Sequence, residues 1–410
     1  MKLIFACFLF AFQFFTAICW AQYGCTDPQA QNFDPAASWN DGSCIYTTTN
    51  YTLQLITDLS DELQETSGLI FCNNNLLNIN DGGNSTEIQE LDTQGNILRT
   101  IHVSGSQNID WEAICQNDST IFLGDFGNNG GNRQDLCIYR ISKNQLIGND
   151  TVGMSKFLFT YPDQSSYANT SNNHNFDCEA FVYSNDSLHL FTKGWQNLYT
   201  KHYVLPTNTT DTVIAILRDS LWVDGLITDA TIDSATGRLL LVGYKNNGSN
   251  FYTSFVYLLF DYPTTNFFSR NKRRIEIGNM LTVSQTEGIT FQSATEGFIS
   301  SEKITSNFLT IPPKLFSFDF SAYFENSQSF LDPLAFQINE LHPNPANQQI
   351  TLPWTYKNLV FLDDKGAEIV RIKSFNESQI LDLTSLPLVP HSLYFICNED
   401  TKKTVKFIYQ

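Results

Sequence analysis

The sequence predicts an all-β fold, a six-bladed β-propeller followed by a small C-terminal β-sandwich. The middle of the chain consists of apolar runs of about five residues separated by clusters of Gly, Asn, Asp and Ser, which is typical of short strands joined by turns. Aromatic residues make up 14% of the chain, and no long stretch has the period of a helix. The apolar runs also fall into self-similar units, which indicates a repeat architecture.

Each unit begins with a carboxylate, a small residue within three positions, and an apolar strand. A polar turn and a second apolar strand follow, and this strand runs into a charged or Gly/Asn-rich segment. Five units are visible, and they begin at Glu65, Glu112, Glu179, Asp229 and Glu287. A sixth, assembled from "YTLQLITDLS" near the start and "KLFSFDFS" near the end, would close the ring. We therefore predict a propeller over residues 50–324, with a seven-bladed ring or an array of β-sandwiches as alternatives.

The leading carboxylates of the units are the strongest candidate site residues. The first strand of each propeller blade lines the central channel, so these five side chains are expected to converge there. Like charges in a narrow channel raise one another's pKa and destabilise the fold unless a cation or donor compensates. Calcium is the expected ion, because the ligands are hard oxygens, with Glu112, Glu179 and Glu287 as its candidate ligands.

The channel rim is expected to carry the charged residues of the loops, which are Asp81, Asp110, Asp125, Lys193, Lys245 and Lys303. Lys193 and Lys303 could instead act as built-in counter-ions, and the acids would then form a purely structural ring. His174 is a loop residue close to the rim, either in the site or merely solvated. Trp111 could stack on a sugar or lie in the core. No HExxH or GxSxG motif occurs, so the chain lacks the signatures of those hydrolases.

The charge balance of the chain argues against nucleic acid as a partner. Lys and Arg number 24 against 42 Asp and Glu, which gives a formal net charge of -18. Such a field repels nucleic acid and anionic membranes, and no basic stripe offsets it.

The N-terminus predicts export. Lys2, an apolar run to Trp20 and the small residue Ala21 form a secretory signal peptide over residues 1–21. A membrane anchor is the alternative, although no basic stop-transfer cluster follows. After cleavage no segment is long enough to span a bilayer. The mature chain keeps an odd number of cysteines, which leaves at least one unpaired or intermolecular: Cys25, Cys44, Cys72, Cys115, Cys137, Cys178 and Cys397.

A short module over residues 22–46 follows the signal peptide. Cys25 and Cys44 close a loop rich in Asp, Asn and Pro, and a disulfide between them would contribute about 3 kcal/mol through the entropy of the unfolded chain. Asp27, Asp34 and Asp41 could hold calcium or simply form turns. The segment "YGCTDPQAQNFDPAASWNDGSC" resembles the GCTDPxAxNYxPxAxxDDGSC module of secreted Bacteroidetes proteins, with Phe in place of its Tyr and Asn in place of its first Asp.

A change in composition after a linker at residues 325–337 marks a second β domain over residues 338–410. The pieces "PNPA", "LDDKGAEI", "DLTSL" and a last strand preceded by "KK" occur in order, and together they resemble the type IX secretion C-terminal sorting domain. "LPLVPHSLY" stands where that family has a Gly-containing turn. The resemblance implies that the secretion machinery is a partner and that the protein is secreted or held at the outer cell surface after passing through the periplasm. An ordinary accessory sandwich is the alternative.

The repeat units resemble secreted six-bladed propellers, a group that includes calcium-dependent lactonase-like and phytase-like enzymes. The resemblance covers the plan of the blades alone, so activity does not follow from it. Two functions stay open. One is a propeller that binds an extracellular ligand without chemistry, and the other is a calcium-dependent hydrolase at the channel mouth.

Overall fold

The computed structural model describes residues 22–248, 251–305, 309–324, 349–362, 368–389, 392–398 and 403–409. The chain divides into two compact units, Met1–Ser327 and Gln328–Gln410. The expected signal peptide and linker lie outside the described residues. None of the helices in the described ranges has the length and hydropathy needed to cross a membrane.

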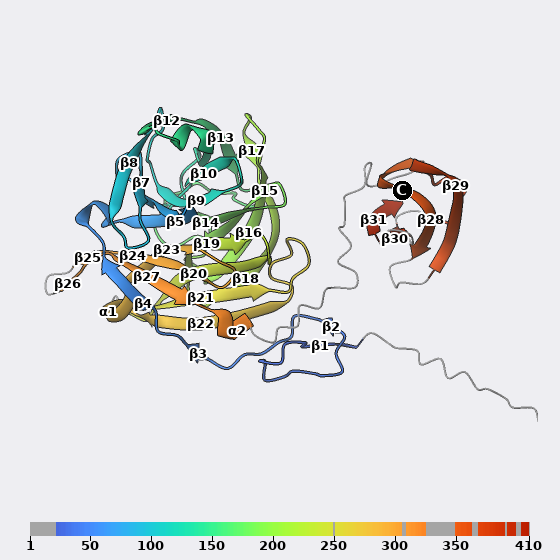
Figure 1. Cartoon of the computed structure of the whole chain (residues 1–410), viewed down its shortest axis with the longest axis horizontal. Helices are drawn as coiled ribbons and strands as arrows, with labels where there is room; N and C mark the ends of the chain where they lie inside the picture. The colour runs from blue at the N-terminus through green and yellow to red at the C-terminus, as the bar shows by residue number, and fades with distance from the viewer. Residues whose placement is uncertain are drawn as a thin grey trace, which may run out of the picture. The chain divides into compact units, whose positions relative to one another are not determined.

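The first unit is a β-propeller of five blades, each an antiparallel sheet whose strands follow one another outward from the centre (Figure 1). The first three blades consist of β5 (Thr66–Cys72), β6 (Asn75–Asn80), β7 (Glu87–Leu91) and β8 (Ile97–Ser104); β9 (Trp111–Gln116), β10 (Thr120–Asp125), β11 (Cys137–Ser142) and β13 (Ser155–Thr160); and β14 (Asp177–Ser184), β15 (Ser187–Lys193), β16 (Tyr199–Pro206) and β18 (Ile216–Trp222). The last two consist of β19 (Leu226–Asp233), β20 (Arg238–Asn246), β21 (Tyr252–Phe260) and β22 (Asn271–Asn279); and β23 (Gln285–Phe291), β24 (Glu296–Glu302), β27 (Lys314–Asp319) and β4 (Gln54–Asp58).

Short elements complete this unit. Three of them add a parallel strand to the outer edge of a blade: β12 (Thr151–Gly153), β17 (Val213–Ile214) and β3 (Thr49–Asn50). The others are β1 (Tyr23–Gly24), β2 (Trp39–Asn40), β25 (Ile304–Thr305), β26 (Thr310–Ile311), the 3-10 helices η1 (Asp61–Leu63) and η2 (Lys143–Leu146), and the one-turn helices α1 (Met280–Val283) and α2 (Ser321–Phe324).

The inner hairpins form where the sequence supplies left-handed turn residues. Asn73 and Asn74, with φ of 52° and 67°, join β5 to β6, and Asn185 and Asp186, with φ of 46° and 57°, join β14 to β15. Two consecutive residues with positive φ make a tight hairpin turn whose twist matches that of the strands, and Asn and Asp tolerate this conformation better than other residues with side chains. These local signals are why the repeat units could be recognised from the sequence.

The predicted sixth blade is wrong. The innermost strands contact one another in the cyclic order β5, β9, β14, β19, β23 and again β5, so five blades already close the ring among the described residues. The two segments assigned to a sixth blade are β4 and β27, and they pair with each other inside the fifth blade. β4, which precedes the first blade in the chain, thus supplies the outer strand of the last blade and links the two ends of the ring.

The core lies between neighbouring blades and is rich in aromatic side chains. Between the second and third blades, for example, the rings of Phe126 and Phe181 meet at 5.2 Å and those of Tyr161 and Tyr203 at 4.7 Å. Trp111 belongs to this buried framework, because it is fully buried and its indole N–H donates to the carbonyl of Gln107 (2.8 Å). It is therefore a core residue with no face open to a ligand. The buried cysteines of the propeller are free thiols: Cys72, Cys115, Cys137 and Cys178.

The predicted disulfide between Cys25 and Cys44 is present. Within the module the carboxylates of Asp27, Asp34 and Asp41 each accept a backbone N–H from two residues further on, at 2.9 Å. This is the geometry of Asx turns, so turn formation accounts for these residues. The module packs against the fourth blade, where the buried Asn40 donates to Asn271 (2.7 Å).

The second unit contains one antiparallel sheet in the order β29 (Glu368–Asp382), β28 (Gln349–Leu362), β30 (Ser392–Asn398) and β31 (Lys403–Tyr409). Leu359, Phe361 and Ile396 form its buried core. A second sheet, which the predicted sandwich requires, is not among the described residues. The "PNPA" segment and the tip of the "DDKG" turn also lie outside them.

Candidate functional site

A β-bulge recurs at the same place in the innermost strand of every blade. In each case one residue is skipped in the pairing with the second strand, and these residues are Ser67, Glu112, Glu179, Thr228 and Glu287. A bulge bends the strand and re-aims a side chain, and such bulges are frequent next to functional sites. Three blades therefore present a glutamate at this position and two present a hydroxyl.

Two of the five predicted channel carboxylates, Glu65 and Asp229, do not occupy the bulge position. Glu65 lies two residues before the bulged Ser67; its side chain is exposed and accepts a hydrogen bond from Asn84 (2.6 Å). Asp229 lies one residue after the bulged Thr228 and is fully buried inside the ring. Its Oδ2 accepts the backbone N–H of Ile289 (2.8 Å), its Oδ1 has no hydrogen-bond partner, and burial raises its pKa well above the usual value. Both errors arose because the repeat was aligned on the nearest acid.

In four of the blades the residue after the bulge is small, namely Gly68, Ala113, Ala180 or Gly288, and the aligned segments read "TSG", "WEA", "CEA" and "TEG". Alignment on this residue would have replaced Glu65 with Ser67, but in the remaining blade Asp229 itself follows the bulge. The two hydroxyl residues at the bulge tie neighbouring blades together. Ser67 donates to the carbonyl of Glu112, and Thr228 donates to that of Thr286, each at 2.8 Å.

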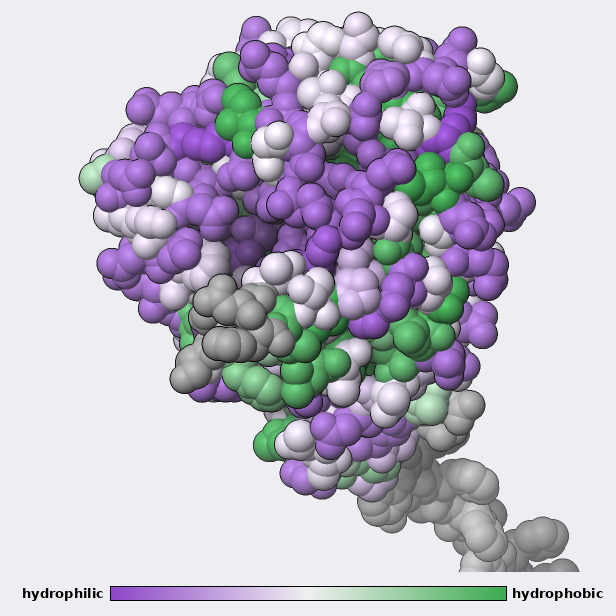
Figure 2. Space-filling view, turned by 90° about the vertical axis from the view of Figure 1, so that its left-hand side faces the viewer, coloured by the Kyte–Doolittle hydropathy of each residue, from purple (hydrophilic) through white to green (hydrophobic). Residues whose placement is uncertain are grey.

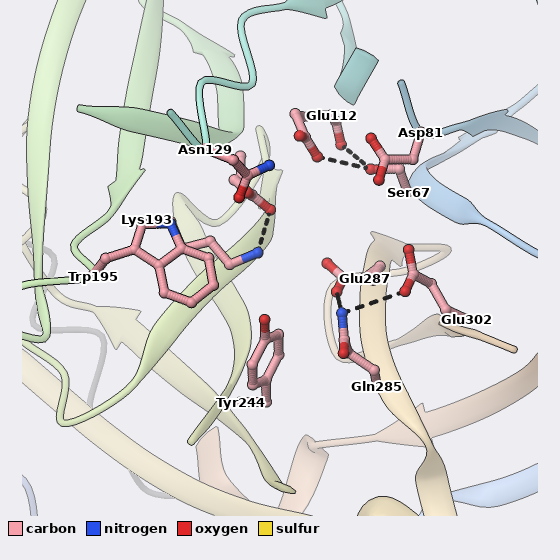
Figure 3. A pocket seen from close by; sticks show the side chains of 11 residues that line it. Ser67, Asp81, Glu112, Asn129, Lys193, Trp195, Tyr244, Gln285, Glu287 and Glu302 are labelled. Atoms are coloured by element: carbon pink, nitrogen blue, oxygen red, sulfur yellow. Dashed lines mark hydrogen bonds and ion pairs between the residues drawn. The ribbon is translucent and has the colours of Figure 1, made fainter. Parts of the chain in front are cut away.

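The three bulged glutamates line a polar cavity of about 180 Å³ at the centre of the propeller. The other residues around it are Ser67, Asp81, Asn129, Lys193, Trp195, Tyr244, Gln285 and Glu302 (Figure 3). The face of the molecule in Figure 2 has a hollow with hydrophilic walls. Of the predicted residues, Glu112, Glu179, Glu287, Asp81 and Lys193 thus come together. Tyr244 and Glu302 were missed because they lie near the ends of second strands, where the sequence resembles ordinary core and turn.

One wall of the cavity is a buried ion pair framed by aromatic rings. The ammonium of Lys193 binds Glu179 at 2.7 Å, and both side chains are almost completely buried. The same ammonium lies 5.1 Å from the ring centre of Trp195 and 5.3 Å from that of Tyr244, within cation–π range. Burial opposes the charged form of Lys193, but Glu179, with smaller contributions from Tyr244, Glu287 and Asp177, more than offsets it, and the pKa of Lys193 is raised well above its ordinary value. Lys193 is therefore a resident cation of the cavity.

A second wall contains two carboxyls bridged by one amide. Gln285 donates from its Nε2 to Glu287 and, at 3.3 Å, to Glu302. Burial raises the pKa of Glu287 to about 7 and, together with the charge of Glu287, raises that of Glu302 well above the usual value. Both shifts favour the protonated forms of this pair.

At the third wall, the lining residues Asp81 and Glu112 form a cluster of three carboxylates with Asp110, which does not itself line the cavity. Asp81, Asp110 and Glu112 each offer an oxygen within 4.8 Å of the others. Burial and then the charge of Asp81 raise the pKa of Asp110 to about 7 and that of Glu112 well above the usual value. Among the described residues no donor reaches either side-chain oxygen of Asp110, and Glu112 accepts only a long bond from Ser67 at 3.3 Å.

Two glycines border this cluster because a side chain would fill it. A Cβ on Gly127 would lie 2.2 Å from Oε1 of Glu112 and 2.5 Å from Oδ2 of Asp110, and one on Gly82 would lie 2.4 Å from Oδ1 of Asp110. Neither glycine has a positive φ, so the backbone conformation does not require glycine at these positions. Glycine is required there because a side chain would occupy the space next to the carboxylates.

The structure does not bring the three predicted calcium ligands together. Glu112 belongs to the cluster, whereas Glu179 is bound by Lys193 and Glu287 by Gln285, so neither shares an ion-sized space with it.

The remaining rim predictions have partners outside the cavity. Asp125 is fully buried against Arg133 (2.9 Å), Lys245 binds Asp224 (2.6 Å) and Lys303 binds Asp61 (2.7 Å). None of the three lines the cavity.

His174 positions the loop that carries Asn129. One ring nitrogen of His174 contacts the carbonyl of Asn129 at 3.1 Å, and the other accepts the N–H of Phe176. Its role is therefore to hold a cavity loop, not to reach the ligand space itself.

No protein-family model matches the sequence, and no curated protein matches it. Among solved structures, the PQQ-bound aldose sugar dehydrogenase of Streptomyces coelicolor is 8% identical, with a TM-score of 0.35, over 65% of this chain and 98% of that one. Regucalcin of Agrobacterium tumefaciens, a calcium-binding protein, is 12% identical, with a TM-score of 0.36, over 67% and 95%. A GH43 β-1,3-galactosidase is 7% identical, with a TM-score of 0.39, over 65% and 94%. None of these likenesses assigns an activity to the chain.

Proposed function

We propose that this protein is a calcium-dependent ligand-binding propeller whose ion is held by Asp81, Asp110 and Glu112. The observation that carries the proposal is the cluster of three carboxylates, bordered by two glycines that keep its space open. Asp81 accepts the backbone N–H of Gly82 and Glu112 a long bond from Ser67, and no donor among the described residues reaches the carboxylate of Asp110. Glu112 is buried and Asp81 and Asp110 are half-buried, and carboxylates this close repel one another unless protons or a cation compensate. A hard divalent cation suits an all-oxygen set of ligands.

The cluster fits calcium better than magnesium. Calcium takes six to eight oxygens in flexible geometry, whereas magnesium requires a near-ideal octahedron. Three carboxylates leave coordination positions open, and Ser67 and Asn129 contribute further oxygens to the same cavity. When bound, the ion would neutralise the cluster and offer those open positions to a ligand.

Calcium affinity is expected to rise about tenfold between pH 6 and pH 8, and Asp110→Asn is expected to lower it at least about tenfold at pH 8. The pKa of Asp110 is raised to about 7, so below pH 7 a proton competes with the ion and above pH 7 the carboxylate is free to bind. Calorimetric titration of the mature protein with calcium at both pH values measures the effect.

Asp118→Asn is the matched control, because Asp118 is exposed in the turn between β9 and β10 of the same blade. Its affinity should equal that of the wild type. Absence of calcium binding at pH 8, or equal losses in both variants, would contradict the proposal.

A calcium-dependent hydrolase is the second candidate, and one observation favours it. Glu287 has a pKa of about 7 and lies beside a second carboxyl, which suits a general base at neutral pH. Turnover of a chromogenic lactone or phosphate ester that is lost in Glu287→Gln, while calcium binding persists, would support this function. Calcium binding without any turnover would leave the binding function alone.

Export is part of the proposal. The expected signal peptide at residues 1–21 and the resemblance of the C-terminal region to a type IX sorting domain support a secreted or surface-attached protein that the secretion machinery handles. The disulfide in the N-terminal module is consistent with an oxidising compartment.

A further inference from the structure

The walls of the cavity outside the carboxylate cluster carry little net charge. Lys193 is the only cationic side chain among the lining residues, and Glu179 already neutralises it at 2.7 Å. Glu287 and Glu302 share the donor Gln285, and burial favours their protonated, uncharged forms. If the cluster holds its ion, the remaining space therefore offers no free cation for a phosphate or carboxylate and few free anions for an amine.

These walls nevertheless offer both hydrogen-bond donors and hydrogen-bond acceptors. Carboxyl oxygens of Glu287 and Glu302 accept, their protonated forms donate, and the amide of Gln285 does both. In Figure 3 the phenol of Tyr244 points into the cavity, opposite the side that carries Asp81 and Glu112. A ligand with several hydroxyl groups can satisfy such a mixture, whereas an apolar ligand would leave buried groups unpaired.

The indole of Trp195 is fixed as a flat surface beside these groups. Its N–H donates to Asp177 at 2.7 Å, and the other oxygen of Asp177 accepts the backbone N–H of Asn128 at 2.6 Å. The N–H edge of the indole is thus already hydrogen-bonded within the protein. The ring lines the cavity and remains partly accessible. A ring held in this way can receive the C–H face of a ligand.

The volume limits the size of that ligand. About 180 Å³ is well below the 300–1,000 Å³ of pockets that enclose drug-sized molecules. The space therefore suits one small ring or one terminal unit of a longer molecule.

We infer that the organic ligand is one uncharged, polyhydroxylated ring, such as a single neutral sugar unit, with neighbouring hydroxyls on the ion and its C–H face on Trp195. The inference rests on the proposed calcium site, because the ion both neutralises the cluster and binds the hydroxyls. Asp177 is a positioning residue in this arrangement, because it orients Trp195 without facing the ligand.

The test is saturation-transfer NMR on the mature protein with glucose, galactose, mannose and N-acetylglucosamine at millimolar concentration, with calcium or with a chelator. Glucosamine and glucose 6-phosphate serve as cationic and anionic probes. We expect at least one neutral sugar to bind only with calcium, and to bind more strongly than either charged probe. Trp195→Ala should lower its affinity by roughly tenfold or more and leave calcium binding intact.

Trp222→Ala is the matched control, because Trp222 lies on the outer strand β18 and is 55% exposed. Trp195→Phe keeps a flat ring and should retain much of the binding, which separates stacking from misfolding. If the protein binds calcium but no neutral sugar, this inference is wrong and the ion site remains supported. Preference for glucosamine or for glucose 6-phosphate overturns it as well. Calcium titration without sugar tests the ion site separately.

Discussion

Replacing Lys193 with methionine is expected to lower the free energy of unfolding by about 3–5 kcal/mol at pH 8. Lys193 and Glu179 are 5% and 2% exposed and meet at 2.7 Å, so the variant leaves Glu179 as a buried carboxylate without its counter-ion. Burial already raises the pKa of Glu179, and Lys193 is the main group that opposes this rise. The variant therefore needs Glu179 to take a proton on folding, and the loss of stability should grow as the pH rises above the pKa of an unfolded glutamate.

Chemical denaturation at pH 5 and pH 8 measures this difference, with Lys303→Met as the control. Lys303 pairs with Asp61, which is 82% exposed, and an exposed pair contributes about 0–1 kcal/mol. The double variant Lys193→Met/Glu179→Leu should recover most of the loss, since it removes both charges. A Lys193→Met protein that is as stable as Lys303→Met at both pH values would show that the pair is not buried.

Replacing Gly127 with alanine is expected to weaken calcium binding by roughly a hundredfold or more. The added methyl group would lie 2.2 Å from Oε1 of Glu112 and 2.5 Å from Oδ2 of Asp110, so both carboxylates must move away from the position at which they share an ion. The backbone should accept alanine, because Gly127 has no positive φ. Calorimetric titration measures the affinity, and circular dichroism checks that the propeller has formed.

Gly153→Ala provides the matched comparison for Gly127→Ala. A Cβ at Gly153 would approach only Oε1 of Gln145, at 3.4 Å, on the outer edge of the first blade. Its calcium affinity should equal that of the wild type. Normal calcium binding by Gly127→Ala would place the ion elsewhere and refute the assigned cluster.

Local sequence signals predicted the parts of the fold that depend on neighbours in the chain. The hairpins follow from left-handed Asn and Asp pairs such as Asn73–Asn74, and the disulfide follows from two cysteines that close a short loop. The number of blades depends instead on a pairing between β4 and β27, which lie at opposite ends of the propeller sequence. A strand's own residues do not specify which distant sheet it joins, so one extra blade was predicted.

The sequence likewise predicted some residues of the candidate site and missed others. Glu112, Glu179 and Glu287 were found because an acid recurs in three blades. Glu65 and Asp229 were misassigned because a one-residue bulge changes which side chain faces the centre. Trp195 and Tyr244 could not be distinguished from core aromatics by sequence, since their role depends on which blades meet at the cavity.

The pairing of β4 with β27 has a consequence for how the molecule forms. Asp58 and Lys314, which form an ion pair across these two strands, are 256 residues apart in the chain. β4 leaves the ribosome before the inner strands of all five blades but is among the last to find its neighbour, so the nascent protein remains an open arc until nearly all of this unit has been synthesised. Contacts between such distant segments form slowly, so the unfinished arc has a long interval in which chaperones can keep it from aggregating.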